Sequence, residues 1–249
     1  MEDAGVLVRE MLESSGLTAS RVAKRAGVSG STLHRIVNDQ VDPSLGTLRE
    51  VAIACGRHVS LSTTHLSDPL AACAARSTLE EDYEPPDDPD VARWRERLPR
   101  LAGGTDPVDI VKVAAHASSP LRRPGGALYS SSVSLARLAS AGDASGGLWA
   151  LSGAAGLYLP PDGGVAPAVT ILWCEDVRAV EHLLVGSGLR PIVRVDQAEV
   201  AVIAAEPELF AGSFTHGIIR YVAPIQIVLD CISQGGKVAD DAIEEVTSW

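Results

Sequence analysis

The spacing of apolar residues in the first quarter of the chain predicts a bundle of short helices. Apolar positions recur at helical intervals over residues 7–66. Turn-forming residues divide this pattern into four or five helices, at Gly16, Gly27, Asp42-Pro43 and Gly56. Helices this short can bury their apolar stripes only against one another. We therefore expect residues 1–66 to fold as a mainly α-helical bundle.

The last 160 residues combine helical and strand patterns. Helical spacing predicts helices over 91–101, 107–116 and 131–141, a helix start at Ser152-Gly153-Ala154-Ala155, a helix within EDVRAVEHLLVGSGL, and two final helices divided at Gly235-Gly236. Short runs rich in Val and Ile predict strands at AVTILWC, PIVRVD and EVAVIAAE. We therefore expect residues 91–249 to form an α/β (α+β) domain.

Between these regions the composition is acidic and rich in proline. Seven acids and three prolines lie between Glu80 and Asp90. Such a segment has too little apolar surface for its burial to offset the conformational entropy lost on ordering. The pattern predicts an exposed linker over residues 67–90.

Composition and charge indicate an ordinary folded protein. The chain has 249 residues, 46% of them hydrophobic, with a formal net charge of −11. No apolar run is long enough to span a bilayer, and MEDAGVLVRE lacks the features of a signal peptide, so we expect a cytoplasmic protein. The four cysteines are scattered without metal-ligand spacing, which predicts free, mostly buried thiols and no metal site or cofactor.

One stretch departs from the acidic balance. Residues 17–38 hold four basic residues and no acid. Thr18-Ala19-Ser20 predicts the cap of a first helix, Gly27 a sharp turn, and Ser29 the cap of a second helix that runs to about Asn38. Apolar residues at Val22, Ala23, Val28, Leu33 and Ile36 are spaced to pack the two helices together. This is the pattern of a helix-turn-helix, whose second helix enters the major groove of DNA.

The stretch resembles the Cro/repressor-type (XRE) helix-turn-helix family over about sixty residues. The matching residues are Leu17, Thr18, Val22, Ala23, Ala26, Gly27, Val28, Ser29, Ser31, Thr32, Leu33, Arg35 and Ile36, followed by the block Asp42-Pro43-Ser44-Leu45-Gly46-Thr47-Leu48. The resemblance implies double-stranded operator DNA as the partner and the helix over 29–38 as the reading element.

The same resemblance implies which side chains meet the DNA. Groove-facing residues would be Gly30, Ser31, Thr32, His34 and Arg35, and residues near the phosphates would be Arg21, Lys24 and Arg25. Ser29, the cap of the second helix, is also expected among the DNA-binding residues. Hydroxyl, imidazole and guanidinium groups can all donate to base edges or phosphate oxygens. Many family members carry Gln where this chain has Ala19 and Gly30, so two of the family's contacts are missing here.

The C-terminal region resembles AbiEi-type antitoxins of type IV toxin–antitoxin systems and related regulators. The matching residues are Leu151, Ser152, Gly153, Ala155, Tyr221, Val222, Pro224, Ile225, Gln226, Leu229 and Asp230. These antitoxins usually carry a winged helix at the N-terminus, where this chain carries the XRE-like pattern. The resemblance implies, as an alternative function, an antitoxin that neutralises a cognate toxin protein and regulates its own promoter.

An enzymatic alternative is a nucleotidyltransferase-like fold. Such enzymes hold two Mg²⁺ ions on acids at alternate positions of one strand. Here Glu175 and Asp176 are adjacent, so a strand would point them to opposite faces, and Asp196 supplies only one more carboxylate. We therefore expect a degenerate fold of this type at most, with no catalytic residues and no enzymatic activity.

The patterns together predict a transcriptional regulator. We expect a repressor that binds operator DNA as a homodimer, with its recognition helices in successive major grooves about 34 Å apart. The second domain is expected to serve in dimerisation or partner binding.

Overall fold

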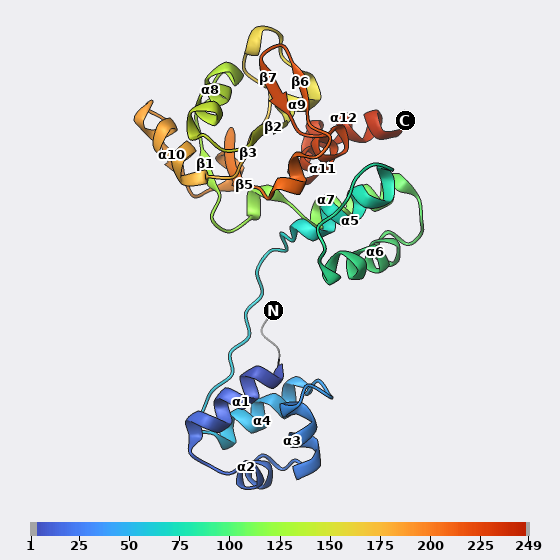
Figure 1. The fold of residues 1–249 in the computed structure, drawn as a ribbon, viewed down its shortest axis with the longest axis vertical. Coiled ribbons are helices and arrows are strands. Elements are labelled where there is room, and N and C mark those ends of the chain that lie inside the picture. The colour runs from blue at the N-terminus through green and yellow to red at the C-terminus, as the bar shows by residue number, and fades with distance from the viewer. Residues whose placement is uncertain (1–3, 248–249) are drawn as a thin grey trace. The chain divides into compact units, whose positions relative to one another are not determined.

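The computed structural model describes residues 4–247, and the chain divides between Thr64 and His65 into two compact units (Figure 1). The first unit is all helical, with α1 at Ala4–Ser15, α2 at Ala19–Ala26, α3 at Gly30–Val37 and α4 at Leu45–Ala54. Its core includes residues that the helical spacing marks (Val22, Ala23, Leu33, Ile36, Leu48 and Val51), together with Val8 of α1. The predicted mainly α-helical bundle is confirmed.

The second unit contains a seven-stranded mixed sheet in the order β4-β1-β5-β3-β2-β7-β6. Its strands are β1 (Ala127–Tyr129), β2 (Trp149–Gly153), β3 (Thr170–Cys174), β4 (Pro191–Ile192), β5 (Val200–Ala204), β6 (Phe214–His216) and β7 (Ile219–Tyr221). The central strands β3 and β5 are parallel, as are β2 and β7, and the other neighbours are antiparallel.

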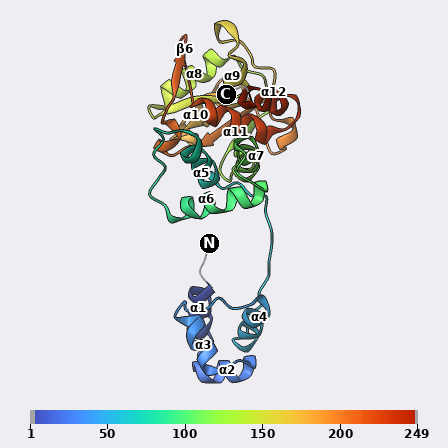
Figure 2. The same cartoon turned by 90° about the vertical axis from the view of Figure 1, so that its right-hand side faces the viewer.

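Helices of the second unit both cover the sheet and pack beside it. They are α5 (Pro69–Leu79), α6 (Pro89–Ala102), α7 (Pro107–Ala117), α8 (Leu135–Ser145), α9 (Ala154–Tyr158), α10 (Val177–Gly186), α11 (Pro224–Gln234) and α12 (Gly236–Thr247). The helices α5, α6 and α7 contact one another, and α5 and α7 also contact α11 (Figure 2). The predicted α/β (α+β) class is confirmed.

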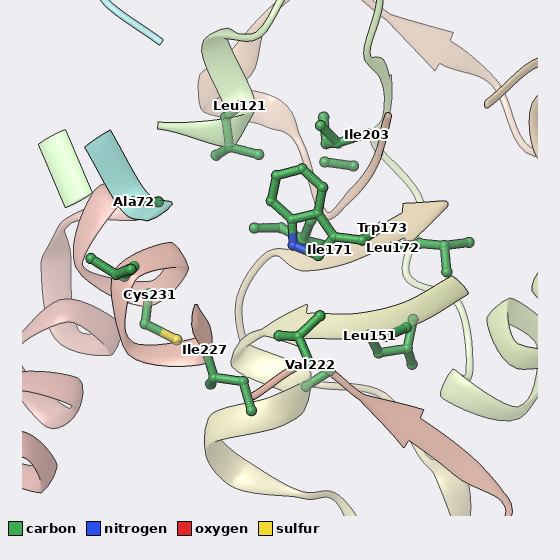
Figure 3. Packing of buried hydrophobic residues seen from close by; sticks show 14 of the residues in the cluster. Ala72, Leu121, Leu151, Ile171, Leu172, Trp173, Ile203, Val222, Ile227 and Cys231 are labelled. Carbon is green, nitrogen blue, oxygen red and sulfur yellow. The ribbon is translucent and has the colours of Figure 1, made fainter. Parts of the chain in front are cut away.

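Alternation along β2 shows that helices lie on both faces of the sheet. Trp149 donates from its indole to Asp143 of α8, whereas Ser152 donates to Asp230 of α11. Side chains alternate between the two faces along a strand, so Trp149 and Ser152, three positions apart, point to opposite faces. The helices α8 and α11 therefore cover opposite sides of the sheet. Figure 3 shows Leu151 and Leu172 on one side of the strands and the α11 residue Cys231 on the other.

The predicted linker over residues 67–90 is wrong in its first half. Residues 69–79 form α5, capped by Asp68, which also accepts a hydrogen bond of 2.8 Å from the indole of Trp94. The buried face of α5 consists of Ala71, Ala72, Ala74, Ala75 and Arg76. Alanine has a high helix propensity and permits close helix contacts, but it produces only a weak apolar periodicity.

Further along the chain, three predicted elements shift. The helix expected over 131–141 is α8, which begins at Leu135. Ser152 and Gly153 end strand β2 and do not begin a helix, and within PIVRVD only Pro191–Ile192 pairs in the sheet. The helices expected over 91–101 and 107–116 are confirmed as α6 and α7.

The structure also bears on the predictions about the cysteines and about membrane-spanning helices. All four cysteines are free; Cys174 and Cys231 are buried, while Cys55 and Cys73 are half-buried. Within residues 4–247, no helix is both long and apolar enough to cross a bilayer.

Candidate nucleic-acid interface

Local capping chemistry forms the turn between α2 and α3. The Thr18 side chain caps α2 by accepting from the Arg21 amide at 3.4 Å. Gly27 ends α2 with φ 68°, a left-handed conformation that glycine adopts without strain. Ser29 then caps α3, its hydroxyl accepting from the Thr32 amide at 3.0 Å. The predicted caps and turn are therefore confirmed.

Three hydroxyl groups gather at the N-terminus of α3. The Ser29 hydroxyl lies 2.8 Å from the Ser31 hydroxyl and 2.7 Å from the Thr32 hydroxyl. The first turn of a helix presents unpaired amides and a partial positive charge. Together with the hydroxyls, this end of α3 can donate hydrogen bonds to phosphate oxygens or base edges.

The predicted contact residues lie on α2, α3 and the turn between them. Eight of them are exposed and Thr32 is half-buried: Arg21, Lys24, Arg25, Ser29, Gly30, Ser31, Thr32, His34 and Arg35. The intervening apolar residues Val22, Leu33 and Ile36 are buried. Burial of the apolar set leaves the polar set on the outside of the helix pair, where a partner can reach it.

Electrostatics favour an anionic partner at this face. Over residues 4–247, the ion pairs do not include Arg21, Lys24, Arg25 or Arg35. The first 64 residues contain seven Arg or Lys and seven Asp or Glu, so the net charge of −11 comes entirely from the remaining residues. Cations without an ion-pair partner can interact with a polyanion, whose counterions they would displace on binding.

Two residues that sequence reasoning missed support this face. The Asn38 side chain donates to the His34 carbonyl oxygen at 2.8 Å, and its amide nitrogen lies 3.2 Å from Nε2 of His34. Arg9 of α1 pairs with Asp39 at 3.1 Å, which ties the end of α3 to α1. In the sequence, the only feature that marked Asn38 was its place at the end of the acid-free stretch; its contact with His34 was not predicted.

A second polar cluster lies in the core of the second unit. Asp230 of α11 is 2% exposed and accepts three hydrogen bonds. The donors are the Ser152 hydroxyl at 2.5 Å, the Trp173 indole at 2.8 Å and the Gln226 amide at 2.9 Å. Ser152 on β2 lies far in the sequence from Gln226 and Asp230 on α11, so the fold brings distant segments together in this cluster.

Burial controls the ionisation of this cluster. It raises the pKa of Asp230 to about 6, against the opposing effect of the three donors and of Arg123. The Arg123 guanidinium lies 4.9 Å from the centre of the Trp173 ring. Burial lowers the pKa of Arg123, which Asp230 partly offsets.

The three acids of the enzymatic alternative have structural partners. Glu175 accepts from the Leu148 amide at 2.7 Å, Asp176 caps α10, and Asp196 pairs with Arg194 at 2.6 Å. Over the described part of the chain, 4–247, no three His, Cys, Asp or Glu side chains are grouped so that they could hold a metal ion.

Comparison with protein families agrees with the geometry of the first unit. Residues 3–62 match the model of a helix-turn-helix domain family. No curated protein and no solved structure matches the chain. The chain therefore carries a helix-turn-helix domain at its N-terminus, which indicates a DNA-binding regulator.

Proposed function

We propose that this protein is a transcriptional repressor that binds operator DNA through α3. The observation that carries the proposal is the exposed, acid-free face of α2 and α3, on which four cations have no carboxylate partner among residues 4–247. Occupation of a promoter by this face would block transcription. The helix-turn-helix match supports DNA binding, and the repressor role is our inference from it.

The polar side chains of this face divide into two roles in this proposal. Ser31, Thr32, His34 and Arg35 on α3 would contact base edges, with Arg35 suited to bidentate recognition of guanine. Arg21, Lys24 and Arg25 on α2 would contact phosphates and position the helix. Ser29 would act mainly as the cap, and Gly30 would contribute only its backbone.

We further propose that the repressor acts as a homodimer in the cytoplasm. Helix-turn-helix dimers bind half-sites about 34 Å apart, so the operator should be an inverted repeat. Sedimentation analysis of the free protein and of its DNA complex tests this stoichiometry. A single protomer bound to a half-site at saturation would contradict it.

The decisive experiment is a fluorescence-anisotropy titration with the DNA upstream of the protein's own coding sequence. Arg35→Ala should weaken specific binding by about 1–3 kcal/mol, that is, roughly 5- to 150-fold, and relax the preference at one base pair. Lys24→Ala should weaken all sequences alike and reduce the salt slope by about one. Arg57→Ala is the matched control, because Arg57 is also exposed in the first unit but lies outside the acid-free stretch.

Two results would contradict the assignment of the reading face. One is an affinity that neither Arg35→Ala nor His34→Ala changes. The other is a loss that Arg57→Ala reproduces. Either result would place the DNA contact away from α3.

A second candidate is an antitoxin in which DNA binding serves only autoregulation. The observation that favours it is the convergence of Ser152, Gln226 and Asp230 in one buried cluster, because these residues belong to the two segments that resemble AbiEi-type antitoxins. In this reading the second unit binds a toxin protein and catalyses no reaction. Co-expression with a neighbouring gene for a nucleotidyltransferase toxin tests it, since growth should be rescued only when this protein is present.

A further inference from the structure

A cavity of about 350 Å³ lies at the carboxyl end of β5 in the second unit. Apolar residues of α5 and of the segment after β5 form much of its wall, including Leu70, Ala72, Ala205 and Leu209. Arg123, Gln226, Asp88, Glu206 and Glu208 add polar groups. β5 is parallel to β3, and the carboxyl ends of parallel strands are where α/β sheets commonly bind ligands.

Arg123 brings one unsatisfied, buried donor to this cavity. Its Nε is buried without a hydrogen-bond partner within residues 4–247, and its terminal nitrogen donates only to the Ser118 carbonyl oxygen, at 3.3 Å. The nearby Asp230 carboxylate already accepts from Ser152, Trp173 and Gln226. A half-buried guanidinium whose Nε is buried and unpaired favours an anionic partner from outside the chain.

The opposite charge lines the same cavity. Glu206 and Glu208 lie on the wall, and neither side chain forms an ion pair with a cation of the described residues 4–247. The thiol of Cys73 also lies on the wall. Burial and the Glu208 carboxylate raise its pKa, whereas Tyr83, Arg76 and Arg123 lower it. Asp88, which caps α6, adds a third carboxylate to the wall, so the cavity presents one half-buried cation and three carboxylates around an apolar interior.

We propose that this cavity binds a small zwitterion with an apolar side chain, of the α-amino-acid class. The carboxylate would pair with Arg123, the ammonium with Glu208 and Glu206, and the side chain would contact Leu70 and Leu209. A free phosphate would be repelled by the two glutamates, and a simple amine would leave Arg123 unpaired. The combination of charges selects a ligand that carries both.

The test uses the full chain without DNA, so it is independent of the proposed regulator function. Leucine, methionine and phenylalanine are titrated and thermal unfolding is followed by tryptophan fluorescence. At least one should raise the Tm by roughly 5 °C at a concentration of about 100 times its Kd. Its deaminated acid and its decarboxylated amine (4-methylpentanoate and 3-methylbutylamine in the case of leucine) should each bind at least about tenfold more weakly.

Variants locate the site. Arg123→Gln and Glu208→Gln should each weaken binding by about tenfold or more, whereas Arg122→Gln, the exposed neighbour, should leave it unchanged. If Arg123→Gln fails to fold, because its guanidinium packs on Trp173, then Glu208→Gln decides. The proposal is overturned if none of the three amino acids binds, if the acid or the amine binds as tightly, or if Glu208→Gln has no effect.

Discussion

The indole nitrogen of Trp173 donates a hydrogen bond of 2.8 Å to Oδ2 of Asp230, which joins the central strand β3 to α11 through the core of the second unit. Both residues are almost fully buried, Trp173 at 1% and Asp230 at 2% exposed. A carboxyl group in such surroundings is retained only because donors from β2, β3 and α11 satisfy it. Because burial also shifts the pKa of this carboxyl group, its protonation contributes to the stability of the fold.

We expect the Asp230 carboxyl to make the second unit less stable as the pH rises. Burial raises its pKa from 3.8 to about 6, so between these values the native state holds a proton that the unfolded state has released. The contribution is fully present below pH 3.8 and is lost as the pH rises through about 6, a change of about 3 kcal/mol. Urea unfolding at several pH values, followed by tryptophan fluorescence, measures it, because all four tryptophans lie after residue 64.

Asp230→Asn is the control for this titration, because it removes the proton equilibrium and keeps the shape. The difference in unfolding free energy between the wild type and Asp230→Asn should fall as the pH rises from about 4 to about 7. A difference that is constant, or that grows with pH, would show that Asp230 is ionised in the native protein well below pH 6 and would contradict the expectation.

The first unit could be predicted from sequence because short-range chemistry determines it. Thr18, Gly27 and Ser29 act on amides or backbone angles within a few residues of themselves, so their types and spacing are sufficient. Exposure of eight of the nine predicted contact residues follows from the same helical spacing that buries Leu33 and Ile36. Their contacts with DNA remain a prediction.

The second unit could be predicted only in part because its key contacts are long-range. Sequence motifs mark Ser152, Gln226 and Asp230, but Trp173 and Arg123 join them only through strand pairing and packing of distant segments. The helix α5 was hidden because its buried face is mostly alanine and because its one long buried side chain is Arg76. That guanidinium reaches the carbonyl oxygens of Leu209 and Ala211, which no local pattern reveals.

Two helical glycines of the second unit should respond oppositely to alanine. A Cβ on Gly142 of α8 would lie 2.5 Å from the Trp149 ring, so Gly142→Ala should destabilise the unit by about 1–3 kcal/mol. A Cβ on Gly186 of α10 would meet nothing within 4 Å, so Gly186→Ala should be neutral or stabilise by about 0.5 kcal/mol. Urea unfolding of both variants measures the contrast, and equal effects would contradict the packing of α8 on Trp149.

Loss of the cap on α3 should affect only the first unit. Ser29→Ala removes the acceptor of the Thr32 amide and should cost about 1 kcal/mol. Far-UV circular dichroism should show the earlier melting, while tryptophan fluorescence should not, because the first 64 residues contain no tryptophan. Ser31→Ala is the matched control, since Ser31 is exposed and caps no helix. A similar loss in Ser31→Ala would argue against the capping role.

Limited trypsin digestion should distinguish the irregular segment after α4, which can be cut, from the helix α5, which is protected. Arg57 is exposed and follows α4, and no helix or strand lies between it and α5. Arg76 is 1% exposed, pairs with Glu80 at 3.0 Å and donates to two carbonyl oxygens, so a protease cannot reach its peptide bond without unfolding α5. Mass spectrometry should therefore detect the fragment 58–249 before any product cut after Arg76. Arg57→Gln should abolish the early cut without exposing Arg76, whereas equal cleavage at both sites in the native protein would restore residues 67–90 as a linker.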